Sequence, residues 1–158
     1  MKKEIYTIGS SARDWEEFVD ILKHFGIKTL VDVRRFPTSK IEHFIKKNLN
    51  SKLKSQTIGY LWLGENLGGY RAGGYKEFMK EDLFQEGILK LEKLAHKNKI
   101  ALMCAERLPW KCHRSYISHQ LEKRDWKIVH IIEKEDPRKE EREIKPTCQQ
   151  KFDLLKPN

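Results

Sequence analysis

A thiol, a carboxylate, an imidazole and a guanidinium lie within one short segment of this chain. Cys104-Ala105-Glu106 is followed six residues later by Cys112-His113-Arg114. A thiol at the first turn of a helix is favoured as its thiolate, and a neighbouring histidine or arginine strengthens that preference. A helix N-terminus also holds anions through its free N–H groups. The segment therefore predicts a nucleophilic or redox Cys112 beside an anion site; the alternative is a cysteine that only packs.

The neighbours of Cys112 each have two interpretations. Glu106 is either a general base or the partner of an arginine, with Arg34 as its counterpart in a purely structural ion pair. Cys104 is either a resolving cysteine for Cys112 or an inert buried thiol. A zinc site formed by Cys104, Cys112, His113 and His130 is a further alternative, but their spacing matches no standard zinc pattern. We therefore predict no cofactor and no metal ligands, and keep zinc as the less favoured alternative.

A short apolar strand and a helix must position this segment. Residues 100–103 are an apolar run of strand length, and residues 114–123 have a helical pattern. Similar runs and patterns alternate along the chain. The predicted strands cover about 5–9, 29–33, 60–63, 100–104 and 128–132, and the predicted helices about 14–25, 40–54, 84–98 and 112–123. This order predicts a single three-layer α/β domain of Rossmann-like type, with a mostly parallel sheet of about five strands.

In such sheets, ligands bind outside the carboxyl ends of the strands. The third predicted strand runs into a glycine-rich loop, residues 64–74, which is either a mobile lid or a plain surface connection. Glycines let a backbone approach a phosphate closely, and an arginine adds charge-assisted hydrogen bonds. The predicted site therefore combines the catalytic candidates Cys104, Glu106, Cys112 and His113 with the substrate-binding candidates Gly9, Ser10, Arg34, Glu65, Gly68, Gly69, Arg71 and Arg114.

The formal net charge of +9 is unevenly distributed. Residues 133–158 carry equal numbers of basic and acidic side chains, so the excess lies in residues 1–132. The segment from Lys40 to Lys54 contains five lysines and one acidic residue, Glu42. A nucleic acid or another anionic partner fits this distribution, and a solvated lysine-rich surface is the alternative. Phe44 is the one aromatic residue in the segment, so the segment itself predicts no platform for stacking bases.

Composition also limits the cellular compartment. No apolar run approaches the roughly 20 residues of a membrane span, and the first strand follows the N-terminus too closely for a signal peptide. Three cysteines without framework spacing fit a reducing cytoplasm. We therefore expect a cytoplasmic protein with no membrane partner. We expect an α/β domain over residues 1–132, followed by a charged tail or peripheral arm over residues 133–158.

Six ordered motifs resemble those of the DUF488 family, whose function is not established. They are Tyr6–Ser11, Val31–Arg34 with Phe36-Pro37, Glu65–Gly69, Leu102–Glu106, Cys112–Arg114 and Val129–Ile131. The resemblance implies a compact α/β domain in which these motifs cluster. The first motif of the family usually reads Thr-Ile-Gly-His-Ser, and Ser10 stands here at the histidine position. A serine hydroxyl cannot act unaided as a base near neutral pH.

These observations favour an enzyme, a hydrolase or group transferase, that acts on an anionic substrate such as a nucleotide or nucleic-acid component. Arginines would bind the anion, Cys112 would be the nucleophile and Glu106 the general base or an arginine anchor. The alternatives are a non-catalytic nucleic-acid-binding module and a thiol redox or metal-binding protein. The sequence leaves the substrate, the reaction and the oligomeric state undecided.

Overall fold

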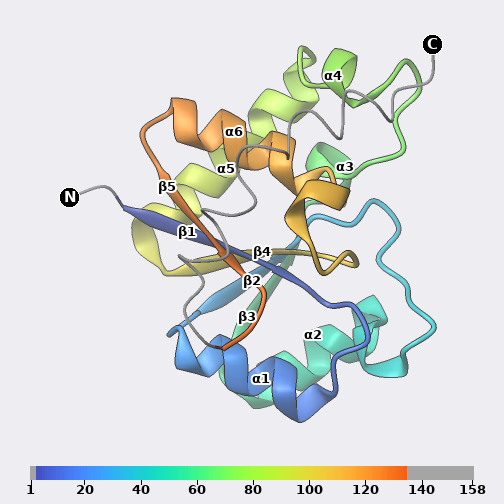
Figure 1. Cartoon of the computed structure of the whole chain (residues 1–158), viewed down its shortest axis with the longest axis vertical. Helices are drawn as coiled ribbons and strands as arrows, with labels where there is room; N and C mark the ends of the chain where they lie inside the picture. The colour runs from blue at the N-terminus through green and yellow to red at the C-terminus, as the bar shows by residue number, and fades with distance from the viewer. Residues whose placement is uncertain (1–2, 135–158) are drawn as a thin grey trace.

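The computed structural model describes residues 3–134, which contain a five-stranded parallel sheet with helices on both faces (Figure 1). The spatial order of the strands is β3-β2-β4-β1-β5. The strands are β1 (Glu4–Gly9), β2 (Thr29–Asp32), β3 (Gly59–Trp62), β4 (Ile100–Cys104) and β5 (Lys127–Ile131). The helices are α1 (Trp15–His24), α2 (Lys46–Ser55), α3 (Gly64–Leu67), α4 (Tyr75–Phe78), α5 (Asp82–Lys97) and α6 (Arg114–Lys123), with 3₁₀ turns η1 (Glu42–Phe44) and η2 (Pro109–Lys111). The predicted α/β class and parallel sheet are confirmed.

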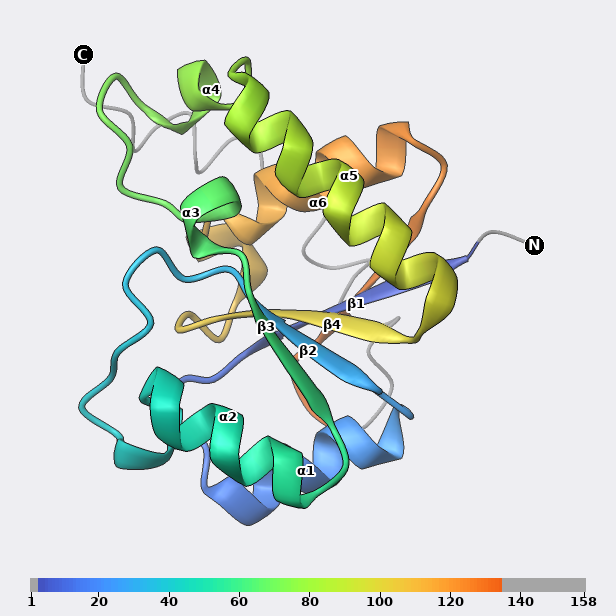
Figure 2. The ribbon, with the colours of Figure 1, turned by 180° about the vertical axis from the view of Figure 1, so that it is seen from behind.

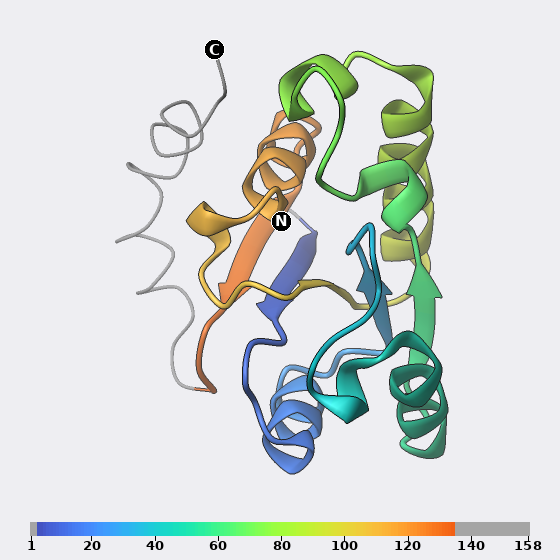
Figure 3. The ribbon, with the colours of Figure 1, turned by 90° about the vertical axis from the view of Figure 1, so that its right-hand side faces the viewer.

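Three layers are visible in the ribbon. Helices α1 and α2 cover one face of the sheet, and α3 to α6 lie on the other (Figures 1 and 2). Each face has its own apolar cluster, one against α1 and α2 and the other against α5 and α6. Figure 3 shows the same sandwich from the side, with the sheet between the two helical layers.

Strand β4 shows why this sequence forms a central strand. All five of its residues are buried, because helices cover both faces of the sheet. Successive side chains point to opposite faces. Ala101 and Met103 therefore join the cluster on the α1 side, whereas Leu102 and Cys104 join the cluster on the α6 side. This alternation directs the Cys104 thiol toward the layer that contains Cys112.

The structure differs from the predicted elements mainly between β2 and β4. The helix predicted over 40–54 begins at Lys46 and is preceded by η1. The side chain of Arg34 donates to the carbonyls of Thr38 and Phe44, which fixes an irregular path for the chain before the helix. The glycine-rich segment 64–74 contains the single-turn helix α3 and leads into α4.

The predicted boundary at residue 132 follows the end of β5 at Ile131. Beyond Lys134, the predicted tail, including Cys148, lies outside the described residues. Within residues 3–134, no helix has the length and apolar character that crossing a bilayer requires.

Candidate active site

Cys112 lies between η2 and α6, where two groups approach its buried sulfur. The backbone N–H of Arg114, at the start of α6, donates to Cys112 Sγ over 3.4 Å. The Nδ1 atom of His113 lies 3.6 Å from the same sulfur. A sulfur that accepts an N–H at a helix N-terminus is in the environment that favours a thiolate. The predicted pairing of Cys112 with a helix start is therefore present in the fold.

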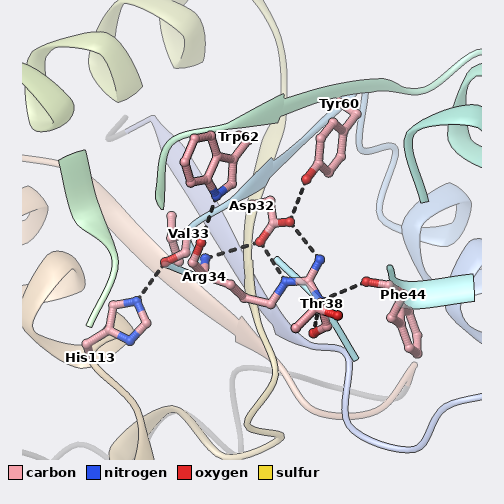
Figure 4. A network of polar contacts seen from close by, with 8 residues as sticks. All are labelled: Asp32, Val33, Arg34, Thr38, Phe44, Tyr60, Trp62 and His113. Atoms are coloured by element: carbon pink, nitrogen blue, oxygen red, sulfur yellow. Dashed lines mark hydrogen bonds and ion pairs between the residues drawn. The ribbon is translucent and has the colours of Figure 1, made fainter. Parts of the chain in front are cut away.

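The tautomer of His113 follows from its other hydrogen bond. His113 Nε2 lies 2.9 Å from the carbonyl oxygen of Val33, at the end of β2 (Figure 4). Because a carbonyl can only accept, Nε2 carries the hydrogen and Nδ1 presents its lone pair to Cys112. The geometry is that of a thiol, a base and a group that orients the base.

The imidazole of His113 is neutral near pH 7. Burial lowers the pKa of His113 to about 4, and the hydrogen bond to Val33 only partly opposes this effect. Although part of the residue reaches the surface, both ring nitrogens face protein partners rather than water. The aromatic ring of Tyr75 also lies against the imidazole, with centroids 5.5 Å apart. The neutral His113 can therefore accept a hydrogen at Nδ1, the atom that faces Cys112 Sγ.

A second thiol lies beside the first. Cys104 and Cys112 are free and buried, and both belong to the apolar cluster on the α6 side of the sheet. The Cys104 thiol donates to the carbonyl oxygen of Glu106 over 3.6 Å. The strand alternation of β4 and the turn before α6 bring together two cysteines that are eight positions apart in the sequence.

Arg114 is fully buried and fastens the loop after β4. Its guanidinium donates to the carbonyl oxygens of Glu106 and Arg107 and to Thr7 Oγ1 in β1. The same loop packs on β1 so closely that a Cβ at Gly9 would lie 2.0 Å from the Glu106 carbonyl oxygen. The Glu106 side chain itself is exposed. The structure therefore brings the backbone of Glu106, rather than its carboxylate, to the thiol pair.

Arg34 belongs to a buried network on the other side of Val33. Its guanidinium forms a bidentate ion pair with Asp32, and Tyr60 donates to the same carboxylate over 2.6 Å (Figure 4). Burial and the Asp32 charge raise the pKa of Tyr60 above its ordinary value, so its hydroxyl remains a donor. Figure 4 shows the Arg34 side chain directed away from His113. The ion pair considered for Arg34 with Glu106 is thus formed with Asp32 instead.

The glycine-rich loop packs on the histidine. A Cβ at Gly69 would lie 3.3 Å from His113 Nδ1, so the absence of a side chain there lets the loop cover the imidazole. Arg71 donates to the carbonyl oxygens of Gly64, Glu65 and Gly68, which caps the end of α3. Burial, and next the charge of Arg35, lower the pKa of Arg71. The contacts of Arg71 organise the loop, and its side chain remains partly exposed.

The remaining predicted residues have clear places. Ser10 is buried and its N–H donates to the Cys104 carbonyl, beside the thiol pair. Glu65 is exposed on α3. His130 Nδ1 lies 2.7 Å from Thr7 Oγ1 within the sheet. Over residues 3–134, no three His, Cys, Asp or Glu side chains gather as metal ligands would.

Two surface hollows lie away from the thiols. One of about 450 Å³ is lined by residues of η1 and α2, including His43 and Lys52. The other, of about 470 Å³, lies between β3 and α5 and is lined by Leu61 and Leu94 among others. Neither hollow is lined by Cys112 or His113, and Gly69 of the glycine-rich loop packs against the His113 imidazole.

Sequence reasoning missed the group that orients His113. The Val33 carbonyl is a backbone atom, and no residue type signals that a carbonyl will accept a hydrogen bond from a distant side chain. Tyr75 was missed as well, because its contact with His113 depends on the path of the glycine-rich loop. An aromatic residue just after that loop was the only available signal.

The family model of a domain of unknown function, DUF488, matches residues 14–121. This match covers more than half of the chain and includes four of the six motifs that resemble the family. The motifs Tyr6–Ser11 and Val129–Ile131 lie outside the matched range. No curated protein and no solved structure matches the chain.

Proposed function

Because the chain belongs to the DUF488 family, whose description states no function, we propose its activity from the geometry of the site. We propose a hydrolase or group transferase in which Cys112 is the nucleophile and His113 its base. The observation that carries the proposal is the contact of Cys112 Sγ with His113 Nδ1, the imidazole being fixed by Val33. A nucleophile within reach of a base, with the base oriented by a third group, is the arrangement that activates weak nucleophiles.

The proposed reaction has two steps. Cys112 Sγ attacks an acyl or phosphoryl centre, its hydrogen passes to His113 Nδ1, and the leaving group departs with that proton. Water, or an acceptor alcohol in a transferase, then attacks the covalent intermediate and frees the thiol. His113 starts neutral, and developing negative charge on sulfur 3.6 Å away favours its protonated form during the transfer.

An anionic substrate is supported by the positive charges around the loop that covers the site. Arg35 and Arg71 are partly exposed there. Arg34 and Arg114 are buried with protein partners, so they would act on a substrate by holding the loops in place. Glu106 is exposed in the loop after β4 and remains a candidate base for the water of the second step.

The first test measures the iodoacetamide labelling rate of Cys112 by peptide mass spectrometry. A Cys104→Ser background prevents a disulfide from masking the result. General base assistance is worth about 10²-fold or more in enzymes, so we expect His113→Gln to slow labelling at pH 7 at least tenfold. Gln is the matched control because its amide N–H can still donate to Val33. Equal rates in the two proteins would show that His113 does not activate the thiol.

Turnover is tested separately with a chromogenic nucleotide ester, thymidine 5′-monophosphate p-nitrophenyl ester. The wild type should release p-nitrophenol, and Cys112→Ser should not. Activity that survives in the Cys112→Ser protein would remove the thiol from the mechanism.

A second candidate function, a thiol redox role, is favoured by the presence of two free, buried cysteines, Cys104 and Cys112, in the same apolar cluster. A hydroperoxide would take two electrons and two protons from the pair, forming the S–S bond and releasing water and an alcohol. Treatment with peroxide should block iodoacetamide labelling of both cysteines, and dithiothreitol should restore it. In the Cys104→Ser protein, peroxide should not produce a disulfide between positions 104 and 112. Unchanged labelling after peroxide treatment would eliminate the redox role.

A further inference from the structure

Two aromatic rings from distant parts of the chain meet at the surface. Phe36 follows β2 and is 60% exposed, and Tyr70 follows α3 and is 87% exposed. Their ring centroids are 6.0 Å apart with an interplanar angle of 38°. Large apolar side chains are normally withdrawn from water, and adjacent exposed ones mark interaction sites. The pair is therefore a candidate binding surface.

The backbone around the two rings is built to present them. Arg35 Nη1 donates to the Tyr70 carbonyl over 2.8 Å, which ties the two loops together. The Arg35 guanidinium also lies 5.7 Å from the centre of the Phe36 ring. A Cβ at Gly68 would lie 2.5 Å from the Arg35 Cβ, so only glycine allows this approach. The two loops thus form one unit.

Tyr70 also has a costly backbone conformation. Its φ of 58° lies in the left-handed region, which is unfavourable for a residue with a Cβ. Although the loop of residues 64–74 contains five glycines, this conformation is adopted by a tyrosine whose ring is almost fully exposed. Strain that persists beside a candidate site is an observation from which function can be inferred.

The position and charge of this surface indicate its ligand. Gly69, the neighbour of Tyr70, packs on His113, so the loop that carries Tyr70 also contacts the candidate active site. Arg35 and Arg71 add positive charge beside them, on a chain with a net charge of +9. Exposed aromatic rings flanked by arginines are how proteins bind bases and phosphates of single strands. An apolar peptide would not require the arginines, and a free anion would not require the rings.

We infer that Phe36 and Tyr70 form a stacking platform for the bases of a single-stranded nucleic acid, with Arg35 and Arg71 facing its phosphates. The inference rests on the proposed function for the reaction that the bound strand would undergo. It names single-stranded nucleic acid as the substrate class of the candidate active site. The binding itself does not depend on that chemistry and is measured without turnover.

The test is fluorescence anisotropy of the full chain with a fluorescein-labelled oligothymidylate about 12 nucleotides long. Stacking is worth about 1–3 kcal/mol per base, so each of Phe36→Ala and Tyr70→Ala should raise Kd by about fivefold to a hundredfold. Tyr70→Phe retains the ring and should bind as the wild type does. Leu89→Ala is the matched control, because Leu89 is 56% exposed on α5 and should leave Kd unchanged.

Three results would overturn the inference. One is the absence of binding at low salt. Another is a Kd that Phe36→Ala and Tyr70→Ala do not change, which would indicate attraction by surface charge alone. The third is competition by thymidine monophosphate at the same concentration as the oligonucleotide, which would show that the ligand is a mononucleotide and not a strand. A negative result in the binding assay does not change the expected labelling rate of Cys112, and a negative labelling result does not change the expected anisotropy. The two proposals can therefore fail independently.

Discussion

The neutral, enclosed His113 should make this protein sensitive to mild acid. In the folded chain, burial lowers the pKa of His113 to about 4, whereas an unfolded histidine titrates near 6.5. Between these two values the unfolded chain binds a proton that the folded chain excludes. The free energy of unfolding therefore falls as pH decreases from about 6.5 to about 4. Above about pH 6.5 His113 causes no such loss of stability.

The size of the effect follows from the two pKa values. For pKa values of about 4 and 6.5, the loss between pH 7 and pH 5 is about 2 kcal/mol, rising to about 3 kcal/mol at pH 4. A loss of this size is a large fraction of the 5–15 kcal/mol that is typical of whole domains. The carboxylates of the protein also titrate in this range, so His113 must be isolated by comparison with a variant.

The assay is urea unfolding, followed by circular dichroism, of the wild type and His113→Gln at several pH values from 7 to 4. Gln retains an N–H donor for Val33 but does not titrate, so the difference in unfolding free energy between the two proteins isolates the imidazole. We expect this difference to change by about 2 kcal/mol from pH 7 to pH 5 in favour of the variant. A difference that is independent of pH would show that burial does not lower the pKa of His113. A change of opposite sign would mean a raised pKa for His113, as in a resting thiolate–imidazolium pair.

Two further predictions concern the residues that hold the site in place. Asp32→Asn leaves the buried Arg34 guanidinium without its carboxylate, so the free energy of unfolding should fall by about 3–5 kcal/mol. Tyr60→Phe removes only one partly buried donor to Asp32 and should cost about 1–2 kcal/mol; equal losses in these two variants would contradict the ion pair. Gly9→Ala places a Cβ against the Glu106 carbonyl and should cost about 1–3 kcal/mol or more. Gly59→Ala, where the nearest atom is a Thr29 side-chain oxygen at 3.1 Å, should cost less in the same urea assay, and the reverse order would exclude the tight contact at Gly9.

The strands could be predicted because buried strands consist of runs of apolar residues. Ile100–Met103 is apolar throughout, and the fold buries it on both faces, which makes the pattern hard to misread. The start of α2 could not be predicted in the same way. Lysines are good helix formers over the whole of 40–54, but the hydrogen bonds of Arg34 to two carbonyls determine the path there. Such contacts depend on the tertiary structure.

The candidate site was predictable in position but not in pairing. Parallel strands bring their carboxyl ends to one edge, so Ser10, Cys104 and Cys112 could be expected to lie together. The direction of each side chain could not be expected. Arg34 and Asp32 are two positions apart and form an ion pair, which periodicity alone does not reveal. The contact between the rings of Phe36 and Tyr70 likewise depends on how their loops pack, with Arg35 donating to the Tyr70 carbonyl.

The serine at position 10 has a simple consequence in this geometry. Ser10 is buried and bonded to the Cys104 carbonyl, so the family's usual histidine at this position would begin its side chain beside the same thiol pair. In this chain, an imidazole reaches Cys112 from the start of α6 instead, and a carbonyl of β2 orients it. A base from the first strand is therefore not needed for the proposed chemistry. In the proposed mechanism His113 is the base for Cys112, so the His113→Gln comparison tests both the stability of the fold and the mechanism.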